Sequence, residues 1–304
     1  MKIPAALDAQ RRIGPDWTAW LDRLPALADE IVADWQLTLD GESTHGFCSL
    51  VAPVRTAGGA PAALKVTFDG DEESQHEGLA LQRWGGRATV KLLRADPHRR
   101  TLLLERLHPE DLTTLRDGEA CEIIGGLYAT IHVPALPQLR TITSYVARWT
   151  EAMQQMPRNA PIPRRMVEQA TALAGDFMAD EASTGTLIHG DLHYENVLAG
   201  DREPWLVIDP KPMSGDPHYE PAPLLWNRWD ELDGDIRGGV RRRFHAVIDA
   251  AGLDEDRARD WVVVRMVLNA HWAIEDAERE HRPLDADELS WVTQCIAIAK
   301  AVQD

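Results

Sequence analysis

Long hydrophobic runs are missing from this sequence of 304 residues. The most apolar stretch in its later part, residues 261–264, is cut by Arg265 and is far too short for a membrane span, which takes about 20 apolar residues. Residues 1–8 lack the continuous apolar core of a signal peptide. We therefore expect neither membrane insertion nor export, and predict a cytoplasmic protein without a membrane partner.

Cysteine is also scarce. The three cysteines, Cys48, Cys121 and Cys295, are widely separated and lack the spacing of a metal site. A disulfide framework and a cysteine-ligated metal are thereby excluded, so we expect three reduced, small core residues. The sequence contains no internal repeat and no low-complexity segment either.

Basic residues are fewer than acidic ones. The chain has 32 Lys and Arg against 49 Asp and Glu, which gives a formal net charge of −17. Nucleic acid is therefore not expected as a partner, because its phosphates would be repelled. The acidic balance instead suits a cationic small molecule. Hydrophobic content of 44% and charged content of 27% are those of a globular protein, and the length allows two domains.

Polar residues that need an explanation gather in one stretch, residues 187–198. Two short apolar ends enclose a polar centre that contains His189, Asp191, His193, Glu195 and Asn196. Polar groups buried between apolar strands need partners, because unpaired burial is unfavourable. The stretch is therefore a candidate for a functional site.

A second apolar run, residues 205–208, ends at Asp209 and reads as a buried strand. In kinases a loop aspartate accepts the proton of the substrate hydroxyl, and an asparagine five residues later and a second aspartate at a strand end hold Mg²⁺. Asp191, Asn196 and Asp209 have this order and spacing. The alternative is that Asp191 forms a local turn and Asp209 caps a strand.

The motif at residues 189–196, followed by Ile208, Asp209 and Pro210, resembles the aminoglycoside phosphotransferase family, whose fold is similar to that of protein kinases. Residues 208–211 resemble its streptomycin and hydroxyurea kinase branch. The resemblance implies an α+β, protein-kinase-like fold. Residues 1–106 would form a small, sheet-rich nucleotide-binding lobe with a leading helical segment, and residues 107–304 a larger, mostly helical lobe for catalysis and acceptor binding.

The function implied by this resemblance is that of an O-phosphotransferase that uses ATP and Mg²⁺. Its predicted acceptor is a hydroxyl of an aminoglycoside antibiotic, specifically the 6-hydroxyl of streptomycin, with resistance as the result. Two alternatives stay open. The first is a kinase of the same fold for hydroxyurea, an amino alcohol or a sugar metabolite. The second is a nucleotide-binding module without catalysis, against which the joint presence of Lys65, Asp191, Asn196 and Asp209 speaks.

The first third of the chain is expected to combine a helix with strands. Apolar residues three and four apart predict an amphipathic helix over residues 16–35, or two helices broken near Pro25. The alternating pattern then predicts strands, at residues 37–40, 46–54, 62–68, 90–94 and 101–107. The turn at residues 41–46 takes the place of the glycine-rich loop of a kinase.

Lys65 lies in an apolar strand, where lysine is unexpected. The resemblance implies that it contacts the α- and β-phosphates and is held by a glutamate of the next helix, residues 71–84. Glu77 is the predicted partner and Glu73 the alternative. Lys65 could otherwise be an edge-strand lysine facing water. The hinge is placed at residues 105–109, where backbone groups of Glu105 and Leu107 would contact adenine.

The rest of the chain is expected to be mostly helical, at residues 118–132, 144–155, 164–182, 219–229, 235–251, 254–280 and 285–302. Acceptor binding is assigned to acids and a tryptophan near the carboxyl end, namely Asp230, Glu231, Asp233, Asp235, Trp272, Glu275, Asp276 and Glu278. Carboxylates beside tryptophan suit a guanidinium or ammonium group. The alternative is solvated helix faces. The roles of His193 and Lys211, phosphate contact or local packing and pairing, stay open.

Overall fold

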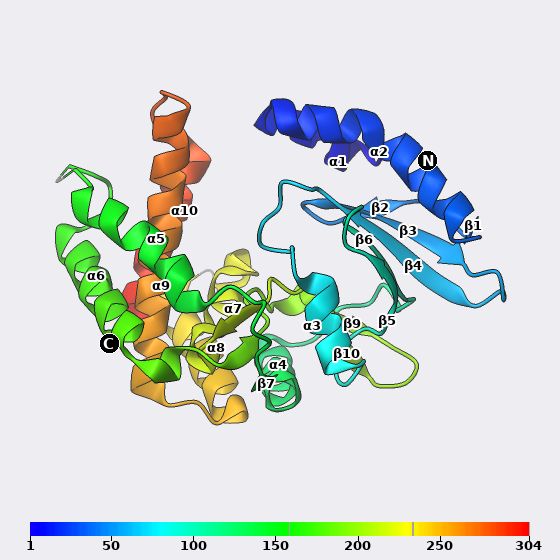
Figure 1. The fold of residues 1–304 in the computed structure, drawn as a ribbon. Coiled ribbons are helices and arrows are strands. Elements are labelled where there is room, and N and C mark those ends of the chain that lie inside the picture. Colours follow the sequence, from blue (N-terminus) through cyan, green and yellow to red (C-terminus); the bar gives the residue numbers. More distant parts are fainter. Residues whose placement is uncertain (158, 233, 304) are drawn as a thin grey trace. The chain divides into compact units, whose positions relative to one another are not determined.

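The computed structural model describes residues 1–157, 159–232 and 234–303. The chain forms two compact units. Unit 1 contains Met1–Glu110 and Leu198–Lys211, and unit 2 contains Asp111–Val197 and Pro212–Asp304. Unit 1 holds an antiparallel sheet and unit 2 is mostly helical, so the predicted α+β class is confirmed (Figure 1). The division into functional lobes after residue 106 stays a prediction.

The sheet of unit 1 has six strands in the order β1-β3-β4-β6-β5, with β2 also paired to β3. The strands are β1 (Thr38–Leu39), β2 (Thr44–His45), β3 (Ser49–Arg55), β4 (Pro61–Thr67), β5 (Leu92–Asp96) and β6 (Thr101–Glu105). Lys65 on β4 lies opposite Val51 of β3 and Leu102 of β6. The strand that carries Lys65 is therefore central.

One face of this sheet is covered by the helix α2 (Pro15–Asp34), which follows α1 (Ala5–Asp8) and the short η1 (Ala9–Ile13) (Figure 1). The helix packs its buried residues on alternate residues of β3 and β4, and Trp17 stacks on Phe68 with ring centroids 4.3 Å apart. Leu64 and Val66 point to this face, so Lys65 between them points to the opposite one.

Of the two alternatives for residues 16–35, the single helix is the one observed, because α2 is continuous through Pro25. A proline lacks the N–H that residue 25 would donate to the carbonyl of Leu21, which weakens a helix locally. Leu24 and Ala28, on either side of Pro25, are fully buried against the sheet. Packing of the apolar stripe thus overrides the local preference for a break.

Helix α3 (Glu77–Trp84) is shorter than the predicted helix at residues 71–84. The carboxylate of Asp71 accepts hydrogen bonds from the backbone N–H of Glu73 at 3.1 Å and from Ser74 Oγ at 2.6 Å. Such local side-chain bonds hold a turn in place of a helix. The helix therefore begins at Glu77.

The glycine-bearing turn at residues 41–46 also differs from expectation. Thr44–His45 pairs with β3, so a strand lies inside the predicted turn. The turn that leads into β3 spans residues 46–49, where the N–H of Gly46 donates to the carbonyl of Ser49 at 3.0 Å. Phe47 is exposed in this turn.

Unit 2 is built from helices, namely α4 (Asp117–Ile131), α5 (Ile142–Gln155), α6 (Arg164–Ala179), α7 (Ala222–Trp226), α8 (Ile236–Ala251), α9 (Glu255–Arg279) and α10 (Ala286–Ala301). Helix α9 packs against α6 and α10 (Figure 1). A small sheet has the order β11-β8-β7, formed by β7 (Val133–Pro134), β8 (Thr186–Ile188) and β11 (Met213–Gly215). A second small sheet, which apart from Val197 belongs to unit 1, pairs β9 (Val197–Ala199) with β10 (Trp205–Val207).

Two predicted helices of unit 2 need correction. The single helix predicted at residues 219–229 is wrong. The chain forms η5 (Pro217–Tyr219), α7 and η6 (Trp229–Leu232) instead, with Pro221 directly before α7 and Arg228 in a left-handed conformation, φ 51°, between α7 and η6. The helix predicted at residues 164–182 ends at Ala179, since the side chain of Asp180 caps the following η3 (Glu181–Ser183).

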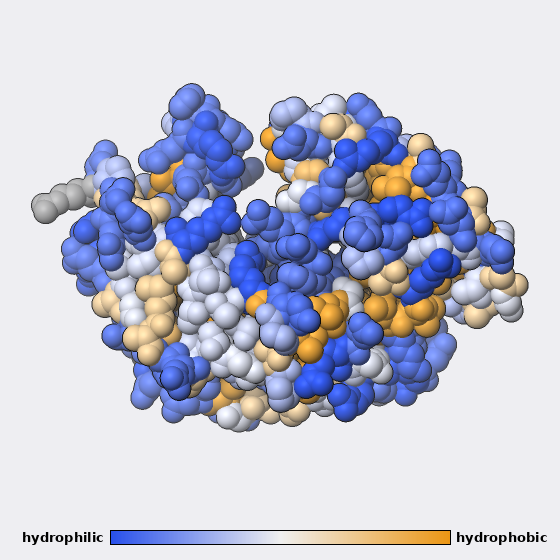
Figure 2. All heavy atoms as spheres, in the orientation of Figure 1, coloured by the Kyte–Doolittle hydropathy of each residue, from blue (hydrophilic) through white to orange (hydrophobic). Residues whose placement is uncertain are grey.

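Surface character agrees with the composition. Hydrophilic residues dominate the face shown in Figure 2, with apolar residues in small groups between them. None of the helices in the described part of the chain is long and apolar enough to cross a membrane. All three cysteines are free thiols, and Cys121 and Cys295 are buried as expected.

Candidate active site

Lys65 is 5% exposed in the central strand of unit 1. Its ammonium donates to both carboxylate oxygens of Glu77 at 2.7 Å and to Asp209 Oδ1 at 2.5 Å. Burial disfavours the charge, but the carboxylates of Asp209 and Glu77 outweigh it and raise the pKa of Lys65. An exposed edge-strand lysine is therefore the wrong interpretation, and Glu77, not Glu73, is the partner.

Glu77 is buried because it is the first residue of α3 and faces the sheet. Burial raises the pKa of Glu77, and the nearby Lys65 ammonium opposes that shift. The start of a helix favours an acidic side chain, since the free N–H groups there are partially positive. The pair thus depends on where α3 begins.

Asp209 lies two residues after β10, with a backbone φ of 53°. This left-handed conformation is unusual for residues other than glycine, asparagine and aspartate. Lys211 Nζ lies 3.9 Å from Asp209 Oδ1 and 3.5 Å from Asp71 Oδ2. Burial disfavours its charge, but Asp209 and Asp71 raise the pKa of Lys211. Lys211 thus pairs with acids, and its contact with a phosphate stays a prediction.

The segment predicted as the hinge starts at the end of β6. Glu105 Oε1 accepts from Arg202 Nε at 3.0 Å, and Glu105 Oε2 accepts from the N–H of Lys91 at 3.1 Å. The side chain of Glu105 thereby ties residues 198–211, which carry Asp209, to the sheet. Leu107 is half-buried.

The predicted catalytic loop lies in unit 2, directly after β8. Asn196 is buried, and its Nδ2 donates to the backbone carbonyl of Asp191 at 2.9 Å. His189 is also buried, and its Nδ1 accepts the N–H of Asp191 at 3.2 Å. Gly190 adopts φ +82°, which glycine allows without strain. The side chain of Asp191 is about one-third exposed, at 32%.

Two buried residues that the sequence reasoning missed hold this loop. Glu220, fully buried, accepts the N–H of His189 at 2.6 Å and that of Gly190 at 3.0 Å. Arg265 on α9 donates from Nη2 to the carbonyl of Gly190 at 2.7 Å. Arg265 had one signal in the sequence, since it interrupts an apolar run. Glu220 had none, because its partners are backbone groups about 30 residues away.

The predicted acceptor residues lie in two places within unit 2. Asp230 and Glu231 are exposed in η6, and both oxygens of Glu231 accept from Arg228 at 2.7 Å. Trp272, Glu275 and Asp276 lie on α9. No hydrogen bond or ion pair joins the two groups among the described residues, which exclude Asp233.

Trp272 belongs to an aromatic cluster between α5 and α9. Its ring meets those of Tyr145 and Trp149 edge-on, with centroids 5.8 and 5.7 Å away. The guanidinium of Arg140 lies over Tyr145 at 4.4 Å, and that of Arg148 over Trp149 at 4.9 Å. Two of the three rings thus carry a guanidinium over one face, whereas no such cation lies over Trp272 among the described residues.

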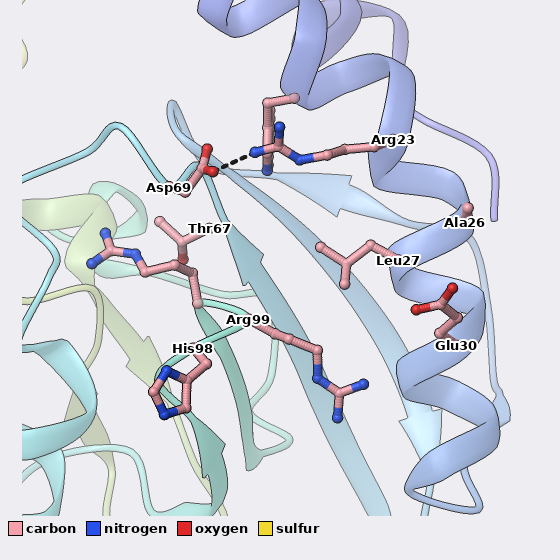
Figure 3. Close-up of a pocket in the computed structure, with 10 residues that line it drawn as sticks. Arg23, Ala26, Leu27, Glu30, Thr67, Asp69, His98 and Arg99 are labelled. Carbon is pink, nitrogen blue, oxygen red and sulfur yellow. Dashed lines mark hydrogen bonds and ion pairs between the residues drawn. The ribbon is translucent and has the colours of Figure 1, made fainter.

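A cavity of about 400 Å³ lies elsewhere in unit 1, beside α2 (Figure 3). It is lined by Trp20, Arg23, Ala26, Leu27, Glu30, Thr67, Asp69, His98, Arg99 and Arg100. Arg23 and Asp69 form an ion pair at its edge. None of the predicted site residues lines it.

The structure thus brings together Lys65, Glu77 and Asp209 within unit 1, and Asp191 and Asn196 within unit 2. Solved structures with a similar fold include a choline/ethanolamine kinase family protein from Mesorhizobium loti, with a TM-score of 0.60 at 16% identity, covering 91% of this chain and 95% of that one. Another is a mutant aminoglycoside phosphotransferase with ADP and hygromycin B, with a TM-score of 0.58 at 16% identity, covering 90% and 97%. The predicted kinase-like fold is confirmed.

Comparison of sequences identifies the family, whereas comparison of structures identifies only the fold. A streptomycin 6-kinase of Streptomyces glaucescens is 37% identical over 283 residues, which cover 90% of each chain. A hydroxyurea phosphotransferase of Kitasatospora aureofaciens is 37% identical over 287 residues, covering 91% of this chain and 82% of the relative. The model of the aminoglycoside/hydroxyurea antibiotic resistance kinases matches residues 34–277. The predicted enzyme class, a small-molecule phosphotransferase, is confirmed, and the chain belongs to the aminoglycoside/hydroxyurea antibiotic resistance kinase family.

Proposed function

We propose that this protein is an ATP-dependent O-phosphotransferase that modifies the 6-hydroxyl of streptomycin and so confers resistance. The observation that carries the proposal is the cluster of the buried Lys65 and Glu77 with the half-buried Asp209. A lysine paired with a helix glutamate, next to a metal-binding aspartate, is the arrangement with which kinases hold the phosphates of ATP. The names of the streptomycin 6-kinase relatives support the choice of acceptor.

Lys65 neutralises the α- and β-phosphates in this proposal, and Glu77 keeps its ammonium in place. The bond from Lys65 to Asp209 is exchanged for bonds to phosphate when the nucleotide binds. Backbone groups of Glu105 and Leu107 contact adenine. The bond between Glu105 and Arg202 joins that segment to residues 198–211, so that the adenine contacts and Asp209 are held within one unit.

Asn196 and Asp209 are the proposed ligands of Mg²⁺, which neutralises phosphate charge when it is bound. Mg²⁺ usually takes only one or two protein carboxylates and completes its shell with phosphate and water oxygens. The amide nitrogen of Asn196 is committed to the carbonyl of Asp191. The amide oxygen, a hard donor, is therefore the atom that Asn196 presents to a metal, and the fit is good.

Asp191 orients the acceptor hydroxyl and accepts its proton during transfer. Its backbone is held at the N–H by His189 and at the carbonyl by Asn196, which fixes the position of the loop. Asp230, Glu231, Trp272, Glu275 and Asp276 are proposed to bind a cationic, guanidinium-bearing acceptor. A cytoplasmic location stays a prediction.

The deciding experiment offers the purified protein MgATP and streptomycin, and identifies the product by mass spectrometry and the position of its phosphate by NMR. Phosphate on the 6-hydroxyl, absent with Asp191→Asn, is the expected result. If streptomycin stays unmodified and no ATP is consumed, the proposed acceptor is wrong.

Hydroxyurea is the second candidate acceptor, because one relative of equal identity is a hydroxyurea phosphotransferase. The same assay with hydroxyurea, an amino alcohol and an amino sugar separates the candidates. Exclusive turnover of hydroxyurea would assign the protein to that alternative and would leave the proposed roles of Asp191, Asp209 and Lys65 intact.

A further inference from the structure

Arg265 is a cation in the core of unit 2. It lies in the middle of α9, is 7% exposed, and follows three fully buried valines at residues 262–264. Arginine is rarely buried without a carboxylate that compensates its charge. The position of this guanidinium therefore requires an explanation.

The bonds of Arg265 go to the catalytic loop and its neighbour. Nη2 donates to the carbonyl of Gly190 at 2.7 Å, and Nη1 reaches the carbonyl of Tyr219 at 3.5 Å. The guanidinium stacks over the rings of Tyr219 at 4.3 Å and Trp226 at 5.0 Å. Within the described residues, Asp191 is the acid that approaches it as an ion pair, with Oδ1 at 4.0 Å from Nη2.

The peptide groups of residues 189–190 are thereby held from two sides. Glu220 accepts their N–H groups, and Arg265 donates to the carbonyl of Gly190. Gly190, at φ +82°, has no side chain of its own to fix this conformation. Asp191 is the next residue, so any shift of the Gly190 carbonyl moves the backbone from which its carboxylate projects.

We propose that Arg265 is a positioning residue for phosphoryl transfer. Its guanidinium fixes the loop at Gly190, and its charge attracts the Asp191 carboxylate and holds it in the orientation that receives the acceptor hydroxyl. This inference rests on the proposed role of Asp191. A purely structural arginine would contribute to stability alone, so the two roles make different predictions.

The test compares Arg265→Met and Arg265→Lys with the wild type, using whichever acceptor the wild type phosphorylates. We expect Arg265→Met to lower kcat by about 10²-fold, the effect of a misplaced catalytic group, with the KM for MgATP unchanged. Arg265→Lys keeps the charge but loses the planar arrangement of donors. Its kcat should lie between those of Arg265→Met and the wild type. If the methionine variant does not fold, the lysine variant carries the test.

Chemical rescue separates positioning from packing. Guanidinium ions added at millimolar levels should raise the kcat of Arg265→Ala several-fold, whereas urea, neutral and of similar shape, should not. Arg257→Met is the matched control, because Arg257 lies on the same helix and bonds to Asp216, Asp180 and Ser183 instead of the loop. It should lower the melting temperature and leave kcat within about two-fold of the wild type.

Three results would overturn the inference. The first is an Arg265→Met enzyme with near-normal kcat. The second is an equal loss of kcat in folded Arg257→Met. The third is a folded Arg265→Ala enzyme that responds alike to guanidinium and urea. Failure of streptomycin as the acceptor affects only the proposed substrate, because turnover is followed with the acceptor that is used.

Discussion

At the scale of single residues, the side chains proposed to bind nucleotide and metal are each held by a hydrogen-bond partner. Lys65 is held by Glu77, Asp209 by Lys65, and Asn196 by the backbone of Asp191. Kinases catalyse mostly by positioning and charge neutralisation, so removal of any one group should affect either binding or turnover. Variants can therefore assign each residue to one of these two steps.

Asp191→Asn should lower kcat and leave the nucleotide site intact. General base catalysis contributes about 10²–10⁴-fold, so we expect a loss of kcat within or above that range. Steady-state kinetics gives kcat, and calorimetry with MgATP supplies the binding control. Normal turnover in this variant removes Asp191 from the mechanism.

Lys65→Met and Asp209→Asn should both weaken MgATP. The first removes the cation proposed for the phosphates. The second removes the charge of a proposed metal ligand, while asparagine still tolerates the left-handed backbone. Lys91→Met is the matched control, since Lys91 is exposed in the same unit. Calorimetric titration decides, and wild-type affinity in both site variants would contradict the kinase site.

His271 predicts a dependence of stability on pH. It is 7% exposed, neither ring nitrogen has a hydrogen-bond partner among the described residues, and Trp149 of α5 meets its ring. Burial lowers the pKa of His271 below 6.5, and Glu275 and Glu278 oppose that shift. The folded state therefore prefers the neutral ring, and its stabilisation is complete above pH 6.5 and lost as the pH falls below it.

Urea unfolding of the wild type and His271→Gln at several pH values measures this effect. The free energy of unfolding of the wild type should fall more steeply below pH 6.5 than that of the variant, which cannot take up the proton. Parallel curves would mean that His271 has the same pKa in the folded and unfolded states, and would contradict the prediction.

At the scale of elements, the sequence predicted well wherever the pattern was local. Apolar periodicity located α2, α4, α8 and α9 because those helices bury a continuous stripe. The segment at residues 71–76 was missed because one side chain, Asp71, bonds back to its own turn. Periodicity carries no information about such a bond.

The site divides in the same way. Asp191 and Asn196 could be proposed as site residues from the sequence, because kinase chemistry fixes their spacing within one loop. Glu220 and Arg265 were missed because they bind backbone groups about 30 and 75 residues away, and a bond to backbone prescribes no pattern in the sequence. Only the three-dimensional structure shows that Glu220 and Arg265 bind the loop.

Pro25 gives a prediction for α2. Pro25→Ala restores the N–H of residue 25 and its bond to the carbonyl of Leu21 in a helix that is already continuous. Proline is about 3 kcal/mol less favourable than alanine inside a helix, and part of this is offset by its stiffness in the unfolded chain. We expect the free energy of unfolding to rise by about 1–2 kcal/mol. Chemical denaturation measures this free energy. A lower free energy of unfolding in Pro25→Ala than in the wild type would contradict the prediction and show that the helix needs the proline.

At the scale of the whole molecule, the net charge of −17 should steer a cationic acceptor toward the protein. Raising the ionic strength from about 0.01 M to about 0.15 M shortens the Debye length from about 30 Å to about 8 Å. The kcat/KM for an aminoglycoside should therefore decrease with added salt. The decrease should be smaller when Asp230, Glu231, Glu275 and Asp276 are replaced by their amides.

Stopped-time assays at constant MgATP measure this salt effect. A neutral acceptor such as hydroxyurea is the control, because its kcat/KM should hardly respond. If a multiply charged aminoglycoside shows no salt dependence, the acids on η6 and α9 are ordinary solvated faces and the cationic acceptor loses its support.

The packing of α2 also decides how the gene can be trimmed. The family match begins at residue 34, so a clone cut to that match would omit all of α2 except its last residue. Its product would turn an apolar sheet face to water, with Leu50, Ala52, Val54, Leu64 and Val66 unprotected. An exposed, flat, apolar strand surface pairs with other chains and precipitates. Inclusion bodies from such a clone would therefore result from the absence of α2 on the sheet. The shortest chain worth expressing starts before residue 15.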